Sequence, residues 1–274
     1  MRWVVGVDVG EGHHGALGFV AWGARSGLLE RGNVVAVHVL EEEHLRVVLR
    51  LHHLDEVTTA AREAAERTLS RQGVTLPLEI VTDVEASDGL AAAAGRLHAE
   101  AIVVGRHAGL DGTGLGRLGR IARRTLRELA VPVIVAPHDL TPEAVGGGPV
   151  LALSSLGEDS IEAVRFARRL ADWMGRELVV AHAVRVPTDR SALEEWTAAN
   201  GVRADHLRIV EGSVLVRAPR LATELQAPIL VAGSRMLTSI ERQLDTSVGS
   251  ELAAAAPLAV AVVPPKRRGP VMGF

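Results

Sequence analysis

The chain has 274 residues, of which 47% are hydrophobic and 23% are charged, and its formal net charge is −3. This length and composition predict a sizeable core in one large domain or two small ones. The nearly balanced charge excludes a general attraction for nucleic acid or for an anionic membrane surface. Because no apolar run reaches about 18 residues without a charge, no membrane-spanning helix is expected.

Two residue types that are scarce or absent exclude further chemistry. Cysteine is absent, so disulfides, thiolate nucleophiles and cysteine-bound metals are excluded, and a reducing cytoplasm is the expected compartment. Lys266 is the only lysine, and it stands in a tail, residues 266–274, that is expected to be flexible. A lysine-dependent phosphate loop and a Schiff-base lysine are therefore excluded from the folded part.

The first half of the chain alternates strand and helix patterns. A helix is expected at 16–24, a long amphipathic helix at 41–72, and further helices at 89–98 and after residue 119. In the long helix, one apolar side is expected to pack on a sheet face rather than on a membrane or a partner. That side consists of Leu45, Val48, Leu49, Leu51 and Leu54. Strands are expected at 2–8, 33–40, 76–84, 99–105 and 131–137.

After a Pro/Gly-rich linker at 138–149 the same series begins again. Strands AIVVGR and VPVIVAP of the first half have near-copies, ILVAGSR and LAVAVVP, at the same places in the second. Apolar strands that alternate with helices are typical of parallel, doubly wound sheets. The predicted fold is therefore α/β, with two tandem doubly wound domains, each with a five-stranded parallel sheet, at 1–140 and 147–265. Strands are expected in the second half at 149–155, 177–184, 206–212, 227–235 and 258–265, and helices at 160–175, 189–201 and 214–225.

Ligands of doubly wound sheets bind at the carboxyl ends of the strands, where the winding reverses. This places candidate residues after strand one, at the end of strand two and in the glycine-rich loop after strand four. That loop contains a G-x-G-x-x-G at 114–119. A dinucleotide fingerprint would follow the first strand closely and would have an acid on the ribose about 20 residues later. Here the preceding strand is the fourth, and the acid at that distance, Asp139, lies in the linker, so the match is accidental.

A glycine loop that leads into a helix can instead bind an anion through backbone N–H groups, without any lysine. Both repeats resemble the universal stress protein family, which has an adenine-nucleotide α hydrolase-like fold. Its nucleotide-binding members carry G-x2-G-x9-G-[S/T] after strand four. Gly105, Gly109 and Gly119 match this motif with one extra residue, and Arg120 replaces the hydroxyl.

The resemblance implies that ATP or another adenine nucleotide, with or without Mg²⁺, is the ligand. Asp8 stands where the family has an adenine-contacting aspartate, and Val39 stands where the family presents backbone groups to the base. The implied first-half site consists of Asp8, Val9, Gly10, Val39, Gly105, Gly109, Gly119, Arg120 and Ile121. In the second half Ser154 replaces the acid, and Met236 and Thr246 replace two glycines. Gly233, Ser247 and Val248 are therefore weaker candidates.

Arg120 allows two interpretations. Its guanidinium could form a fork on a phosphate at the start of a helix. Alternatively, it could belong to a solvated surface ridge with Arg117, Arg123 and Arg124, because their spacing places them on one helix face.

The remaining candidates favour structural roles. No metal site is expected from His13, His14, His52, His53 and His107, because adjacent histidines in a helix point in different directions. His38 and His182 are expected to be hydrogen-bonded core residues, and Ser154-Ser155 to cap a helix rather than to act as nucleophiles. No catalytic residue is predicted, so any ATPase activity would be weak.

The resemblance therefore implies a cytoplasmic, nucleotide-binding regulatory module of the stress response, acting on an unknown protein partner. Family members commonly pair their last strands, so VPVIVAP and LAVAVVP are expected to join the halves as an internal pseudo-dimer, and a further homodimer is left open. The alternative is a degenerate, nucleotide-free member that serves as a structural or protein-interaction module. The longer glycine loop, Arg120 and Met236 favour that alternative.

Overall fold

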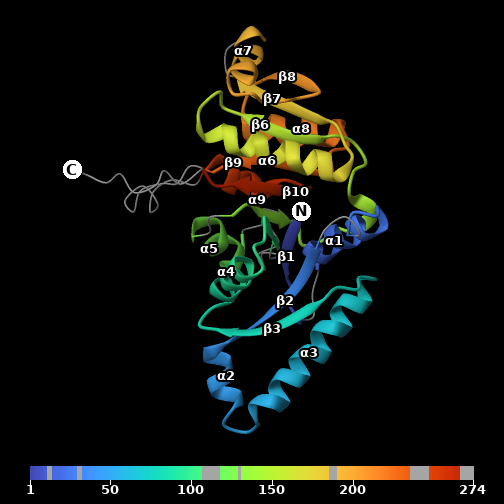
Figure 1. Cartoon of the computed structure of the whole chain (residues 1–274), viewed down its shortest axis with the longest axis vertical. Coiled ribbons are helices and arrows are strands. Elements are labelled where there is room, and N and C mark those ends of the chain that lie inside the picture. Colours follow the sequence, from blue (N-terminus) through green and yellow to red (C-terminus); the bar gives the residue numbers. More distant parts are fainter. Residues whose placement is uncertain are drawn as a thin grey trace, which may run out of the picture.

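The computed structural model describes residues 1–10, 14–29, 33–106, 118–128, 131–184, 190–234 and 247–265 (Figure 1). Several predicted features lie outside these ranges, namely His13, His107, Gly109, Arg117, Met236, Thr246 and the tail at 266–274.

The first half forms a parallel sheet with strand order β3-β2-β1-β4-β5. Each predicted strand is present, within a few residues of the expected bounds. The strands are β1 (Arg2–Gly6), β2 (Asn33–Glu41), β3 (Leu78–Asp83), β4 (Ala101–Gly105) and β5 (Val133–Ala136). The helices are α1 (Gly15–Arg25), α2 (Glu42–Val48), α3 (Leu54–Arg71), α4 (Ala86–Arg96) and α5 (Arg120–Glu128).

The second half repeats this arrangement after a short 3-10 helix, η2 (Pro142–Ala144). Its strand order, β8-β7-β6-β9-β10, reproduces that of the first half. The strands are β6 (Val150–Ser154), β7 (Leu178–Val184), β8 (His206–Glu211), β9 (Ile229–Gly233) and β10 (Ala259–Val263). The helices are α6 (Asp159–Met174), α7 (Ser191–Ala199), α8 (Val214–Glu224) and α9 (Val248–Ala255).

The two five-stranded sheets are joined edge to edge into one ten-stranded sheet. The junction is an antiparallel pairing of β5 with β10, in which Val260 faces Val135 and Val262 faces Val133. This is the pairing of last strands within the chain that the family resemblance implied. Because both strands are fully buried, the junction leaves no exposed strand edge between the halves.

One hydrophobic layer covers each face of the whole sheet. Apolar residues of α1, α3, α6 and α7 pack in the layer on one face, and those of α4, α5, α8 and α9 pack on the other. Alternate strand residues supply the two layers, with Trp3 and Val5 on one side and Val4 on the other. The first layer crosses the junction, because the Trp3 ring lies 4.6 Å from that of Trp173 on α6.

The prediction of one long helix at 41–72 is wrong, because the segment forms two helices that are separated at residues 49–53. Of the predicted apolar side only Leu45 is buried, while Leu51 is 84% exposed and Leu54 is 50% exposed. Val48 and Leu49 are also exposed. The reason for this exposure is visible in Figure 1, where α2 and the start of α3 extend beyond β3, the strand at the edge of the sheet. Only the later part of α3 reaches the sheet, through Ala65 and Leu69.

Candidate functional site

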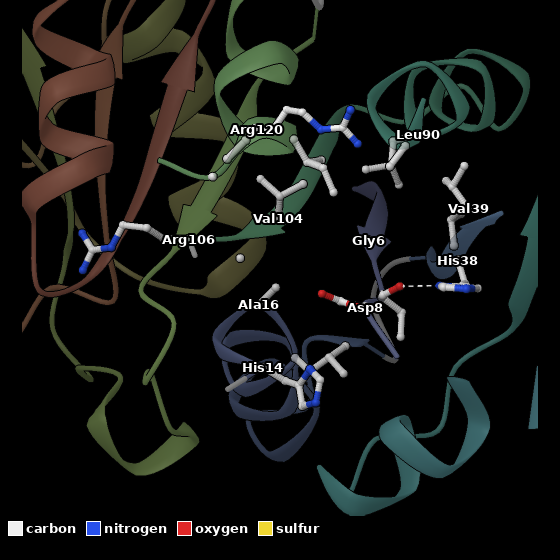
Figure 2. A pocket seen from close by; sticks show the side chains of 18 of the residues that line it. Gly6, Asp8, His14, Ala16, His38, Val39, Leu90, Val104, Arg106 and Arg120 are labelled. Atoms are coloured by element: carbon white, nitrogen blue, oxygen red, sulfur yellow. Dashed lines mark hydrogen bonds between the residues drawn. The ribbon is translucent and has the colours of Figure 1, made fainter. Parts of the chain in front are cut away.

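A cavity of about 600 Å³ opens at the carboxyl ends of β1, β2 and β4 (Figure 2). This is the switch point of the first half, because β1 lies between β2 and β4, with α1 on one face and α4 and α5 on the other. The volume is within the range of small-molecule sites. Six of the predicted site residues line this cavity, namely Asp8, Val39, Gly105, Gly119, Arg120 and Ile121.

The chain that leaves β1 supplies the acid of the site. Asp8 lines the cavity, and its carboxylate Oδ1 accepts a hydrogen bond from the Gly10 N–H at 3.0 Å. Val9 packs against the hydrophobic core instead, and neither Val9 nor Gly10 is among the residues that line this cavity. Of the three residues predicted after strand one, only Asp8 reaches the cavity.

His38 fixes the end of β1 from the neighbouring strand. Its Nδ1 donates to the Val7 carbonyl oxygen at 2.8 Å, the contact drawn in Figure 2. His182 repeats this contact in the second half, on the Ser154 carbonyl at 2.7 Å. The prediction that both histidines are hydrogen-bonded within the fold is confirmed, although both are half-buried and His38 also lines the cavity.

The end of β2 contributes a carboxylate that the sequence analysis did not select. Val39 and Glu41 are two positions apart on one strand, so both project from the sheet face that α4 covers. The Glu41 side chain is 15% exposed, and its Oε1 accepts from the Ala86 N–H at the start of α4 at 3.0 Å. The signal was present in the sequence as the spacing of two from Val39, but residue 41 was assigned to the following helix.

The loop after β4 meets the cavity at Gly105 and again at Gly119, immediately before α5. A Cβ added to Gly105 would come no closer than 4.0 Å to any described atom, and the nearest is on Ala16. Packing among the described residues therefore does not require glycine at this position. The space that a side chain would fill belongs to the cavity, which suits close approach of a ligand to the backbone.

Arg120 crosses the cavity from α5 to β2, and its Nη2 donates to both carboxylate oxygens of Glu41, at 2.8 and 3.0 Å. The arginines that follow also have partners. Arg123 donates to the Leu118 carbonyl at 3.2 Å, and Arg124 forms ion pairs with Glu85 and Asp88. The predicted ridge is thus partly correct, because Arg120 is 65% exposed, but Arg120 attaches α5 to β2, and Arg124 attaches it to the start of α4.

Arg106 lines the same cavity and was also missed. Its side chain turns toward α9 of the other half in Figure 2, where Nη1 donates to the carbonyls of Ala254 at 2.7 Å and Ala256 at 3.1 Å. Burial lowers the pKa of Arg106, and the charge of Asp139 opposes this shift. Arg106 therefore connects the start of the glycine-rich loop to the carbonyl end of a helix in the second half.

The second half places its weaker candidates at the equivalent edge. Gly233 ends β9, and Val248 begins α9 with 45% of its surface exposed. The Ser247 hydroxyl caps α9 by accepting from the Ser250 N–H at 3.2 Å. Because His182 bonds to the Ser154 carbonyl as His38 bonds to that of Val7, the residue at the position of Asp8 is Ser155, and the predicted match of Ser154 to Asp8 is wrong by one residue. The Ser154 hydroxyl accepts from the Leu156 N–H at 3.0 Å, so it stabilises its own loop rather than capping a helix.

In the described part of the chain, no three histidine, aspartate or glutamate side chains are grouped closely enough to hold a metal ion. Each helix among the described residues is too short or too polar to cross a membrane.

These features define a doubly wound α/β protein that consists of two fused repeats, with a cavity at the switch point of the first. The family model described as Universal stress protein family matches residues 1–137. The chain therefore belongs to the universal stress protein family, in a tandem arrangement.

Solved structures agree with this fold. A universal stress protein from Archaeoglobus fulgidus DSM 4304 matches with a TM-score of 0.70 and 18% identity, over 96% of this chain and 98% of that one. A protein of the same family name from Pseudomonas aeruginosa UCBPP-PA14 matches with a TM-score of 0.65 and 18% identity, over 96% and 92%. At this identity the likeness establishes the fold alone. A search among curated proteins finds no match.

Proposed function

We propose that the first half binds an adenine nucleotide, such as ATP, and that the chain serves as a nucleotide-responsive regulatory module in a stress response. The observation that carries this proposal is the cavity at the first switch point. It brings together the carboxylate of Asp8, the backbone of Val39 and two glycines of the loop that flanks β4 and α5.

In this proposal each end of the ligand has its own contacts. The base lies between Asp8 and Val39, where a carboxylate and backbone groups can pair with its polar edge. The phosphates lie against Gly105 and the N–H groups from Gly119 to Ile121, where the start of α5 favours negative charge. The Arg120 guanidinium supplies the charge-assisted donors that replace the family's hydroxyl. Any Mg²⁺ would be bound largely through the phosphates of ATP.

Two measurements test the proposal. Mass spectrometry of the small molecules released on denaturing the purified protein should identify an adenine nucleotide. Titration calorimetry on protein freed of ligand should then give saturable binding of ATP, and Arg120→Ala should weaken it while leaving adenosine binding unchanged. A protein that releases no nucleotide and gives no heat with ATP, AMP or adenosine would refute the proposal.

A second candidate function is a nucleotide-free module for protein interaction. The observation that favours it is the arm formed by α2 and the start of α3, where Val47 is 63% exposed and Leu51 is 84% exposed. Large apolar side chains gathered on an exposed surface are typical of interaction sites. Binding of adenine nucleotides in the calorimetric experiment would contradict the nucleotide-free form of this candidate.

A further inference from the structure

We propose that Glu41 determines the ligand specificity of the first-half site by competing with the ligand's phosphates for Arg120. The competition reduces the affinity for nucleotides in proportion to the phosphate charge they carry. This inference rests on the proposed function, because it assigns a role to a residue of the same cavity. Glu41 is not among the residues that the family resemblance selects.

The contacts make Glu41 the fixed partner of the pair and Arg120 the movable one. Glu41 ends β2, where it lies opposite Asp83 of β3, and its carboxylate is only 15% exposed. The Ala86 N–H and the His44 ring, whose Nδ1 is 3.5 Å from Oε2, also surround this carboxylate. The Arg120 side chain is 65% exposed and reaches Glu41 through Nη2 alone.

The position of Glu41 brings it close to the phosphates in the proposed binding mode. It follows Val39, the proposed base contact, by two residues on the same strand face, and it bonds to Arg120, the proposed phosphate contact. A ligand that spans these two residues passes beside the carboxylate. A phosphate that takes up Arg120 must either replace Glu41 on the guanidinium or share it with a like charge, and both alternatives weaken binding.

The consequence is a selectivity that depends on charge. Adenosine carries no phosphate and does not need Arg120, so Glu41 leaves its affinity unchanged. AMP carries part of the penalty, and ATP carries the largest, because its phosphate chain brings the most negative charge to this side of the cavity. The start of α5 and Arg120 would by themselves make the site bind ATP more tightly than adenosine. Glu41 therefore makes this difference in affinity smaller.

Calorimetric titration of adenosine, AMP and ATP into the wild type and Glu41→Gln tests this inference. Glutamine keeps the size of the side chain and can still accept from Ala86, but it removes the charge. We expect ATP to bind roughly two- to five-fold more tightly, the scale of one partly exposed ion pair. AMP should gain less, and adenosine should change by less than about two-fold.

Glu43→Gln is the matched control, because it removes the same charge from the exposed α2, and Arg120 makes its ion pair with Glu41 rather than with Glu43. It should leave all three affinities unchanged. Glu41→Asp, which keeps the charge but shortens the reach to Arg120, should give a smaller gain for ATP. It also provides a second test if the glutamine variant does not fold, as checked by circular dichroism.

Several results would overturn the inference. Weaker ATP binding by Glu41→Gln would mean that Glu41 positions Arg120 or contacts the ribose. An equal change for all three ligands, or the same gain in Glu43→Gln, would remove the dependence on phosphate and on Arg120. If neither the wild type nor the Glu41 variants bind any of the three ligands, the proposed function fails as well. Binding by the wild type with no gain in either Glu41 variant refutes this inference alone.

Discussion

Arg106 offers a direct test of how the two halves are held together. Its guanidinium belongs to the first half, but both carbonyl oxygens that it contacts, on Ala254 and Ala256, lie at the carbonyl end of α9 in the second. The last carbonyls of a helix lack partners within the helix, and a cation beside them is favourable. Arg106→Met keeps most of the side-chain volume and removes the charge and the donors.

The expected loss of unfolding free energy can be estimated from these contacts. A hydrogen bond to a charged group contributes about 1.5–3 kcal/mol, and the two bonds here share one nitrogen, so together they count as little more than one. Burial of the guanidinium offsets part of this gain, and the buried Nε has no hydrogen-bond partner among the described residues. A net loss of about 2 kcal/mol follows, which corresponds to a fall in Tm of about 4–8 °C for a protein near this size.

Urea denaturation and calorimetric melting of the variant measure this loss. Hydrogen exchange of the last turn of α9 should also become faster, which would place the effect at the contact between the halves. Arg62→Met is the control, because Arg62 is exposed and makes one 3.3 Å bond to the Leu78 carbonyl. A change below about 0.5 kcal/mol for Arg106→Met, or one equal to that of the control, would refute the reasoning.

Three further predictions concern the site, the α2–α3 arm and the acid stability. Gly105→Ala should change the unfolding free energy by less than about 1 kcal/mol, because its Cβ would come no closer than 4.0 Å to any described atom. It should nevertheless weaken ATP binding about ten-fold or more. Gly95→Ala is the control, because Gly95 occupies an open position of α4; it should stabilise the protein slightly and leave ATP binding unchanged. Titration calorimetry measures the binding and thermal melting measures the stability, and a departure of either quantity from its expected value would contradict the prediction. In urea denaturation, Leu45→Ser should lower the free energy of unfolding by more than about 2 kcal/mol and Leu51→Ser by less than about 0.5 kcal/mol, because of these two residues only Leu45 is buried. Similar losses for the two variants would contradict the exposure of Leu51 on the α2–α3 arm. The pKa of the Asp205 carboxyl is lowered, chiefly by the hydrogen bond from the Leu178 N–H and then by that from Arg168. Its contribution to the free energy of unfolding is therefore present above the pKa of the unfolded state and is lost as the pH falls through the pKa of the folded state. Because Asp205 is largely exposed, Asp205→Asn should lose less than about 1 kcal/mol at neutral pH and show a shallower fall of Tm below about pH 4, and an unchanged acid limb would contradict this.

The positions of the strands along the chain and their repetition in the second half could be predicted, because continuous β-branched runs and two similar series of elements are local features of the sequence. The pairing of β5 with β10 was predicted from the resemblance rather than from the residues, and the register of Ala261 opposite Ile134 agrees with it. The prediction of one buried helix at 41–72 was wrong for a physical reason. Its apolar spacing is that of a helix, but spacing does not reveal where a helix extends past the last strand and loses its packing partner.

The missed residues of the site depend on contacts between distant parts of the chain. Glu41 and Arg120 are 79 residues apart, and Arg106 and Ala254 are 148 residues apart. An acid at the end of a strand and an arginine in a loop have many solvated roles, so their types alone do not indicate a pairing. The resemblance did place Asp8, Val39 and Arg120 on one cavity, but it selected Val9 and Gly10 as well, which do not line it.

The two repeats differ in chemistry at matching positions, and these differences support the proposal that the ligand binds in the first half. In the first half Asp8 and Arg120 present charged groups to the cavity. In the second half the Ser247 hydroxyl is already bonded to the start of α9, while Arg106 holds its carbonyl end. Helix α9 is thus fixed at both ends, one of them by a residue of the first-half cavity. Loss of the Arg106 contacts would therefore leave the carbonyls of Ala254 and Ala256 without these two bonds and would weaken the attachment of α9 to the first half.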